Sequence, residues 1–178
     1  MLARFDDLTT IKLEDLRTDL YKAGYLEKVS EWKPHITFGA YEDIDIKSLL
    51  EWVKEFSKNC YTFDMSLSSF GILPPSKNYP DTAVIFIAPS PSKKLFSSYY
   101  GFHKKLDEFC GKIGYPYSAA CTHAYPFHST IGVFNTSKLQ TSLEYLFRHF
   151  TPITAKIIAL EVYTYPMKLI KRFDFLAK

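Results

Sequence analysis

The chain has 178 residues, of which 47% are hydrophobic and 23% are charged. Its length suits one domain better than two independent domains, and its apolar content excludes an intrinsically disordered chain. The 22 basic residues exceed the 19 acidic residues only slightly, giving a net charge of +3. This balance permits a nucleotide or nucleic-acid ligand, but it is unlike the basic stripe of a dedicated duplex-binding protein.

The cysteines and the hydropathy pattern indicate a reducing compartment. Cys60, Cys110 and Cys121 are odd in number and form no Cys-x-x-Cys pair, so they predict neither a disulfide framework nor a thiolate zinc site. The N-terminus lacks the apolar core of a signal peptide, and no apolar run is long enough to cross a bilayer. We therefore expect a cytoplasmic protein without membrane attachment. We also expect a monomer that uses no metal and no cofactor.

Hydrophobic periodicity in the first half of the chain predicts strands alternating with helices. The expected elements are a strand over residues 2–5, a helix capped by Thr9 or Thr10 that ends near Gly24, an extended segment over 34–41, a helix capped by Asp45, and a strand from residue 63 with alternating apolar positions up to 69. A proline-rich loop over residues 74–80 follows and ends this half.

The second half repeats the order of the first. The expected elements are a buried strand over residues 82–88, a helix capped by Ser92 that runs towards Gly111, an extended segment over 127–134, a helix capped by Ser137, and a hairpin of strands over 153–165 and 169–176. A long turn-rich connection precedes residue 127. No segment has the composition of an interdomain linker.

The shared order predicts a single two-lobed domain made of two degenerate repeats, about residues 1–80 and 81–178. At an offset of 93 residues, His128 matches His35, and the apolar positions of the following helices match as well. Two unrelated α+β halves with a common element order are the alternative, because alternating strands and helices are frequent.

The two matched strands carry the same short pattern, His35-x-Thr37 and His128-x-Thr130. Positions i and i+2 of a strand share a face, so each motif presents an imidazole together with a hydroxyl. In-line displacement at phosphorus needs a base on one side and an acid on the other, and two imidazoles near neutral pH supply both without a metal. The hydroxyls of the two threonines can donate to phosphate oxygens. For either histidine alone, an ordinary structural role is the competing interpretation.

A third copy of the pattern, His149-x-Thr151, does not fit this interpretation. It falls at the end of a predicted helix and precedes Pro152, so its side chains do not share a strand face. We exclude it from the candidate site. A histidine-based metal site is a weaker alternative, because no carboxylate or cysteine completes a ligand set at a familiar spacing.

The paired motifs, together with the segment Trp32-x-Pro34-His35 and the element order, resemble the two-histidine (2H) phosphoesterase superfamily over nearly the whole chain. That superfamily includes 2′-5′ RNA ligase-like proteins and cyclic phosphodiesterases. The second motif departs from the pattern of many members, since Phe127 rather than proline precedes His128.

The resemblance implies a bilobal α+β fold with a pseudo-twofold axis, antiparallel sheets lining a central cleft and helices packed outside. It also implies a metal-independent phosphoesterase that acts on 2′,3′-cyclic phosphates or 2′-5′ bonds of RNA ends or nucleotides. By position, His35 and His128 become the acid and base, and Thr37 and Thr130 become phosphate ligands. A non-catalytic module of the same fold that binds nucleotides or RNA ends is the alternative.

Aromatic and basic residues near the motifs are candidates for substrate binding. Tyr125, Phe127 and Tyr41 could stack on a base, although ordinary packing is the competing interpretation for each. The basic candidates for phosphate recognition are Lys33, Arg4, Lys168, Lys171 and Arg172.

Overall fold

The computed structural model describes residues 1–42, 44–109, 112–113, 127–166 and 168–177. Its strands are β1 (Leu2–Phe5), β2 (His35–Thr37), β3 (Tyr41–Glu42), β4 (Phe63–Leu73), β5 (Thr82–Pro89), β6 (Lys112–Ile113), β7 (Ser129–Asn135), β8 (Ile153–Thr164) and β9 (Lys168–Asp174). Its helices are α1 (Asp7–Lys22), α2 (Ile46–Lys58), α3 (Lys93–Phe109) and α4 (Leu139–His149), the last preceded by a 3-10 turn at Thr136–Lys138. None of the described helices is long and apolar enough to span a membrane.

Seven of the described strands form one antiparallel sheet, in the order β2-β1-β8-β4-β5-β7, with β9 pairing β8. The strand β8 is long enough to pair β4 through Ile153–Ile157 and β9 through Ala159–Thr164. A separate pair joins β3 to β6. This architecture confirms the predicted antiparallel α+β fold, and it joins the strands of both halves into one continuous sheet.

Counted from each edge towards the centre, the sheet has strands in corresponding positions on its two sides. Strands β2, β1 and β8 occupy one side, and β7, β5 and β4 occupy the corresponding positions on the other. Central strands β8 and β4 are antiparallel to each other. The two-repeat organisation stays a prediction, and this order supports it.

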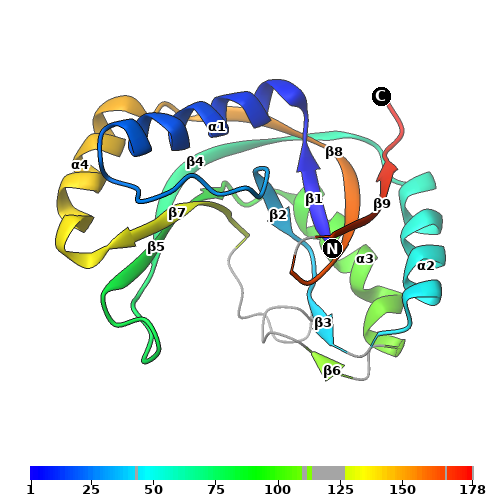
Figure 1. The fold of residues 1–178 in the computed structure, drawn as a ribbon. Helices are drawn as coiled ribbons and strands as arrows, with labels where there is room; N and C mark the ends of the chain where they lie inside the picture. The colour runs from blue at the N-terminus through cyan, green and yellow to red at the C-terminus, as the bar shows by residue number, and fades with distance from the viewer. Residues whose placement is uncertain (43, 110–111, 114–126, 167, 178) are drawn as a thin grey trace.

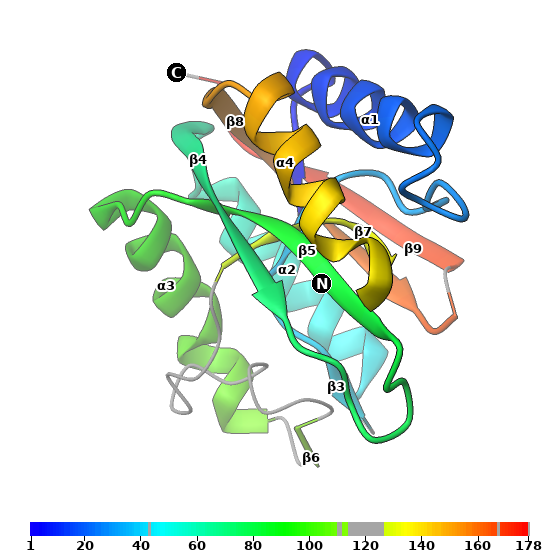
Figure 2. The ribbon, with the colours of Figure 1, turned by 90° about the vertical axis from the view of Figure 1, so that its left-hand side faces the viewer.

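Two pairs of helices pack against the sheet, and α1 contacts strands on both sides of it, β7 and β8. Figure 1 shows α1 and α4 towards one end of the molecule and α2 and α3 towards the other. Contacts join α1 and α4 to β7, whereas α2 contacts α3, β8 and β9. From the side of α4, Figure 2 shows this helix in front of β5 and β7. On the other side, the ring of Phe102 lies 6.0 Å from that of Phe38 and 5.4 Å from that of Phe56. The face of β2 that carries Phe38 is thus covered by α2 and α3.

Two of the predicted helix caps are confirmed. The side chain of Asp45 accepts a hydrogen bond from the amide of Ser48 at 2.8 Å, and α2 starts directly after it. The Ser92 hydroxyl accepts from the Leu95 amide at 3.1 Å before α3.

Two other predicted caps are wrong. Asp6 rather than Thr9 or Thr10 caps α1, because its carboxylate accepts from the Thr9 amide at 3.2 Å while both threonines are buried in the first turns. Asn135 rather than Ser137 provides the capping oxygen before α4, and it starts a 3-10 turn that continues into the helix. Asp6 directly follows β1 and Asn135 ends β7, so both capping residues lie at the junction between a strand and the helical segment after it.

Candidate active site

The first motif lies on β2, where side chains alternate between the core and the opposite face. Ile36 and Phe38 are fully buried, whereas His35 and Thr37 are partly exposed. In the pairing with β1, His35 is opposite Arg4 and Thr37 is opposite Leu2. The apolar residues therefore fix the face from which the imidazole and the hydroxyl project.

The second motif has the same alternation, except that its histidine, His128, is itself buried at 8% exposed. Ser129 and Ile131 are each 1% exposed, whereas Thr130 is partly exposed and shares the side of the strand that His128 takes just before β7. Thr130 is opposite Phe86 on β5. In the part of the chain that the structure describes, the hydroxyls of Thr37 and Thr130 make no hydrogen bond, so both are available to a ligand.

The fold brings the two motif strands together. Strands β2 and β7 stand at opposite ends of the sheet order, yet they contact each other because the sheet curves (Figure 1). A buried arginine on α1 joins the two regions: Arg17 donates from Nη1 to the Trp32 carbonyl at 2.7 Å and from Nη2 to the Thr130 carbonyl. The two motifs, 93 residues apart in sequence, therefore belong to one site region.

The His35 ring is held by a backbone hydrogen bond. Its Nδ1 lies 2.8 Å from the Lys33 carbonyl oxygen. A carbonyl only accepts, so Nδ1 carries the proton and the lone pair of the neutral ring is on Nε2. Burial lowers the pKa of His35 to about 4; the hydrogen bond that it donates to the Lys33 carbonyl opposes this shift, and the charges of Arg4, Arg17 and the N-terminal amine add to it. The imidazole is therefore neutral at physiological pH.

A buried ion-pair network supports the carbonyl that binds His35. Arg4 donates from Nη1 to the carbonyls of Lys33 and Pro34 at 3.1 and 3.0 Å, and its Nε is 3.2 Å from Oε2 of Glu161. Arg4 is only 4% exposed. Its charge is therefore buried and paired, and recognition of phosphate by Arg4 stays a prediction.

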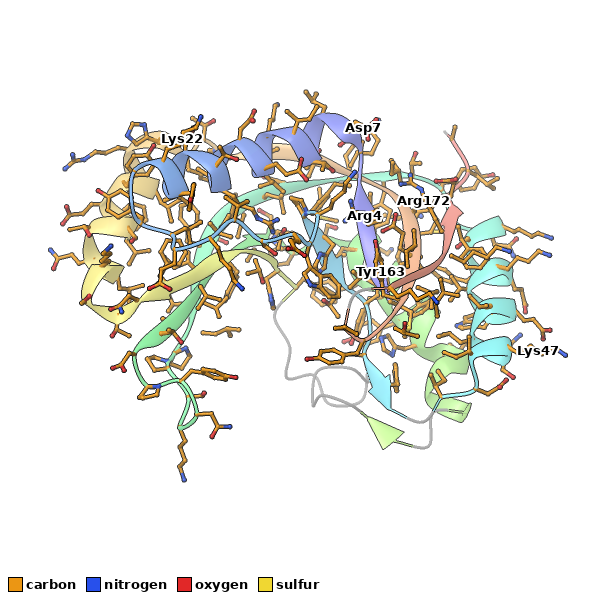
Figure 3. The ribbon with its side chains drawn as sticks, in the orientation of Figure 1. Arg4, Asp7, Lys22, Lys47, Tyr163 and Arg172 are labelled. Carbon is orange, nitrogen blue, oxygen red and sulfur yellow. The ribbon has the colours of Figure 1, made fainter. Side chains whose placement is uncertain are left out.

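Two further side chains complete this network on β8 and β9. Tyr163 donates its hydroxyl to Oε2 of Glu161 at 2.8 Å, and Nη1 of Arg172 lies 3.5 Å from Oε1. Burial and the contact with Glu161 raise the pKa of Tyr163 to about 12, so its hydroxyl keeps its proton. Figure 3 shows Arg4, Arg172 and Tyr163 close to β1, β8 and β9, while Lys22 and Lys47 lie at the periphery.

An aromatic row adjoins the first motif. The Trp32 ring lies 5.6 Å from the His35 ring and 5.6 Å from the Tyr163 ring, measured between centroids. Trp32 and Tyr163 are both partly exposed. This row brings a large aromatic surface next to the imidazole.

The His128 imidazole packs against the Phe86 ring, and this ring fits in its place because residue 71 is a glycine. The Phe86 ring lies 4.7 Å from the imidazole of His128, with an angle of 38° between the planes. Across the ladder, Phe86 is opposite Gly71, and a Cβ on that glycine would lie 2.1 Å from Cζ of Phe86. The missing side chain at residue 71 thus leaves the space in which the ring supports His128.

The other predicted binding residues have different surroundings. Phe127 packs against Phe96 and Tyr99, with ring centroids 5.3 and 4.9 Å apart. The Tyr41 hydroxyl lies 2.8 Å from Nδ1 of His103, which is fully buried. A role for Phe127 and Tyr41 in substrate binding stays a prediction, and Tyr125 lies outside the described residues.

His149 ends α4, with its ring 4.2 Å from that of Tyr145, so the third copy of the pattern lies at a helix terminus as predicted. Within the described ranges, no group of histidine, cysteine and acidic residues is arranged to hold a metal ion.

Sequence reasoning missed Arg17, Phe86 and the network around Glu161. One of these has a signal in the sequence: Arg17 follows Leu13 by four residues and precedes Leu20 by three, so it falls on the apolar face of α1. A charged residue at a core position is unusual, and it indicates a specific partner.

The fold and the motif positions define an antiparallel α+β protein with a candidate two-histidine site. A model of the 2′-5′ RNA ligase superfamily matches residues 6–167. Because this match spans most of the chain and includes both motifs, the protein belongs to that superfamily, which is the 2H phosphoesterase superfamily. Among proteins with curated descriptions, none matches the chain significantly.

The support of His128 by Phe86 predicts the effect of Gly71→Ala. The new methyl group collides with the Phe86 ring, so the ring must move, and we expect the unfolding free energy to fall by about 1–3 kcal/mol. The NMR signals of the His128 imidazole should shift as well. Gly101→Ala is the matched control, because its Cβ meets only Phe56, at 3.7 Å. Wild-type stability together with unchanged His128 signals in Gly71→Ala would contradict this role.

Proposed function

We propose that the protein is a metal-independent phosphoesterase that acts on 2′,3′-cyclic phosphates or 2′-5′ phosphodiester bonds of RNA ends or nucleotides. The observation that carries this proposal is the occurrence of two histidine–threonine pairs on contacting edge strands of one sheet. Membership of the 2′-5′ RNA ligase superfamily supports the same class of substrate.

The surroundings of His35 suit a general base. With Nδ1 bonded to the Lys33 carbonyl, Nε2 is free to take the proton of an attacking water molecule. The low pKa keeps the ring unprotonated at neutral pH. As the water oxygen bonds to phosphorus, the bond between phosphorus and one ribose oxygen breaks. His128 serves as the acid and gives its proton to that ribose oxygen. In the reverse direction, the two histidines exchange these roles.

The threonines suit the phosphate itself. In the transition state, negative charge accumulates on the non-bridging oxygens, and hydroxyl donors placed beside them stabilise it. Thr37 and Thr130 each lie two residues after a histidine on the same side of the strand. One donor from each strand gives both non-bridging oxygens a partner without a metal ion.

The aromatic row suits a nucleobase. A base joined through ribose to a phosphate at His35 is within reach of Trp32, whose ring lies 5.6 Å from the imidazole. Stacking on an aromatic ring contributes about 1–3 kcal/mol and tolerates any base. We therefore add Trp32 to the proposed substrate-binding residues.

Substitution of the paired histidines tests the acid and base roles. We expect His35→Ala and His128→Ala each to lower kcat for a 2′,3′-cyclic nucleotide by about 100- to 10,000-fold, measured in the presence of a chelator. His149→Ala is the matched control, because this residue belongs to the third copy of the pattern and should leave turnover unchanged. Near wild-type turnover in either motif variant would rule out the proposed assignment. Tight nucleotide binding by the wild type without turnover of cyclic or 2′-5′ substrates would favour a binding module.

The low pKa of His35 predicts the acid side of the pH profile. A base works only when unprotonated, so kcat/KM should not fall as the pH is lowered from 7 to 5, and it should drop as the pH passes through about 4. Circular dichroism at each pH separates titration of the active site from acid unfolding. A decline centred near pH 6.5, the ordinary value for histidine, would show that His35 is not the base.

Stacking on Trp32 predicts a selective effect on KM. For a cyclic nucleotide, Trp32→Ala should raise KM by about 5- to 100-fold, because the stacking free energy of the base is lost. The KM for the cyclic phosphate of ribose without a base should hardly change. Tyr61→Ala provides a control, since this aromatic residue is 46% exposed and its backbone pairs with Leu176 rather than with a motif strand. An equal rise in KM for both substrates would exclude a stacking role.

A further inference from the structure

Arg17 is a buried cation that the proposed chemistry does not use. Its side chain extends from α1 and is 2% exposed. The two terminal nitrogens donate to the carbonyls of Trp32 and Thr130, and the buried Nε has no hydrogen-bond partner among the described residues. Nor does any carboxylate in the described ranges lie within ion-pair distance of this guanidinium. Arg4, in contrast, is paired with Glu161.

Such a charge is costly to bury. A cation without a paired carboxylate loses hydration that two carbonyls replace only in part. Position 17 lies on the apolar face of α1 between Leu13 and Leu20, where a leucine or methionine would avoid this cost. Burial lowers the pKa of Arg17 to about 10 although the charge of Glu14 opposes this shift, so the guanidinium is still charged at neutral pH. Stability alone therefore does not account for an arginine at this position.

The Trp32 carbonyl lies in the segment before edge strand β2, and the Thr130 carbonyl lies on edge strand β7. Trp32 is three residues before His35, and Thr130 belongs to the second motif. Strands β2 and β7 contact each other, but among the described strands no ladder of backbone hydrogen bonds pairs them. The bridge through Arg17 is thus a direct hydrogen-bonded connection between the segments that carry the two histidines.

We propose that Arg17 is a positioning residue that sets the separation of the two motif strands by bridging the Trp32 and Thr130 carbonyls. This inference rests on the proposed function of His35 and His128. The planar guanidinium suits the task, because it donates in two fixed directions at once, whereas an ammonium group is a single point charge. Its positive charge acts on His35 together with that of Arg4.

Two substitutions separate the bridge from the charge. Arg17→Lys keeps a cation but loses the planar fork, so kcat should fall about 10- to 100-fold with little change in KM, and the acid limb of kcat/KM should stay near pH 4. Arg17→Met removes both, so a similar fall in kcat should accompany an acid limb that moves to higher pH. Methionine removes the buried charge but leaves the Trp32 and Thr130 carbonyls without this donor; these effects oppose each other, and we expect Arg17→Met to fold.

The matched controls are Arg148→Lys and Arg148→Met on the exposed face of α4, which should change none of these quantities. Folded Arg17 variants with wild-type kcat and an unchanged pH profile would overturn the proposal. So would an Arg17→Met protein that fails to fold, because that result would make the arginine a structural requirement.

A distance measurement tests the bridge independently of any activity. Spin labels at the exposed positions Lys33 and Val133, in a background without other cysteines, report the separation of the two motif segments by electron paramagnetic resonance. We expect one narrow distance distribution with Arg17 and a broader or shifted one in Arg17→Lys and Arg17→Met. Unchanged distributions would refute the bridge. If the wild type shows no turnover but the Arg17 variants still show altered distance distributions, the proposed function is refuted and the bridge is supported.

Discussion

Neighbouring side chains of an extended strand point to opposite faces, and this constraint determines where the candidate site lies. Ile36 and Ile131 are buried, so His35 and Thr130 must project from the other side of their strands. The same pattern recurs on β2 and β7, and the curvature of a single sheet brings these edge strands into contact. Burial of apolar residues in each half therefore also orients the polar groups that we propose to act on phosphate.

The positive charges around the first motif act on the pKa of His35 in the same direction, because each of them lowers it. Arg4 and Arg17 are both buried near His35, and both favour its neutral form. Only Arg4 has a carboxylate partner, Glu161, which leaves the positive charge of Arg17 without an ion pair in the described part of the chain. A positive field in a region of low dielectric stabilises an anion more strongly than it would in water. In the proposed function, the positive charges that add to the effect of burial on the pKa of His35 also attract the phosphate of the substrate.

The local features of this fold could be predicted from sequence, whereas contacts between distant segments could not. Strand alternation correctly placed His35 with Thr37, and the Asp45 cap was visible because it acts on the amide three residues ahead. The bond from Arg17 to Thr130 joins residues 113 positions apart, so no local pattern encodes it. The packing of Phe86 over Gly71 depends on strand register, which the sequence of either strand alone does not fix.

The central claim is that paired imidazoles perform phosphoester chemistry without a metal. The most direct measurement is the turnover of a 2′,3′-cyclic nucleotide by the wild-type protein in the presence of a chelator, with identification of the product. We expect a single 2′- or 3′-monophosphate, because the acid and base occupy fixed positions on either side of the phosphorus. Turnover that disappears on chelation and returns with a divalent cation would contradict the account.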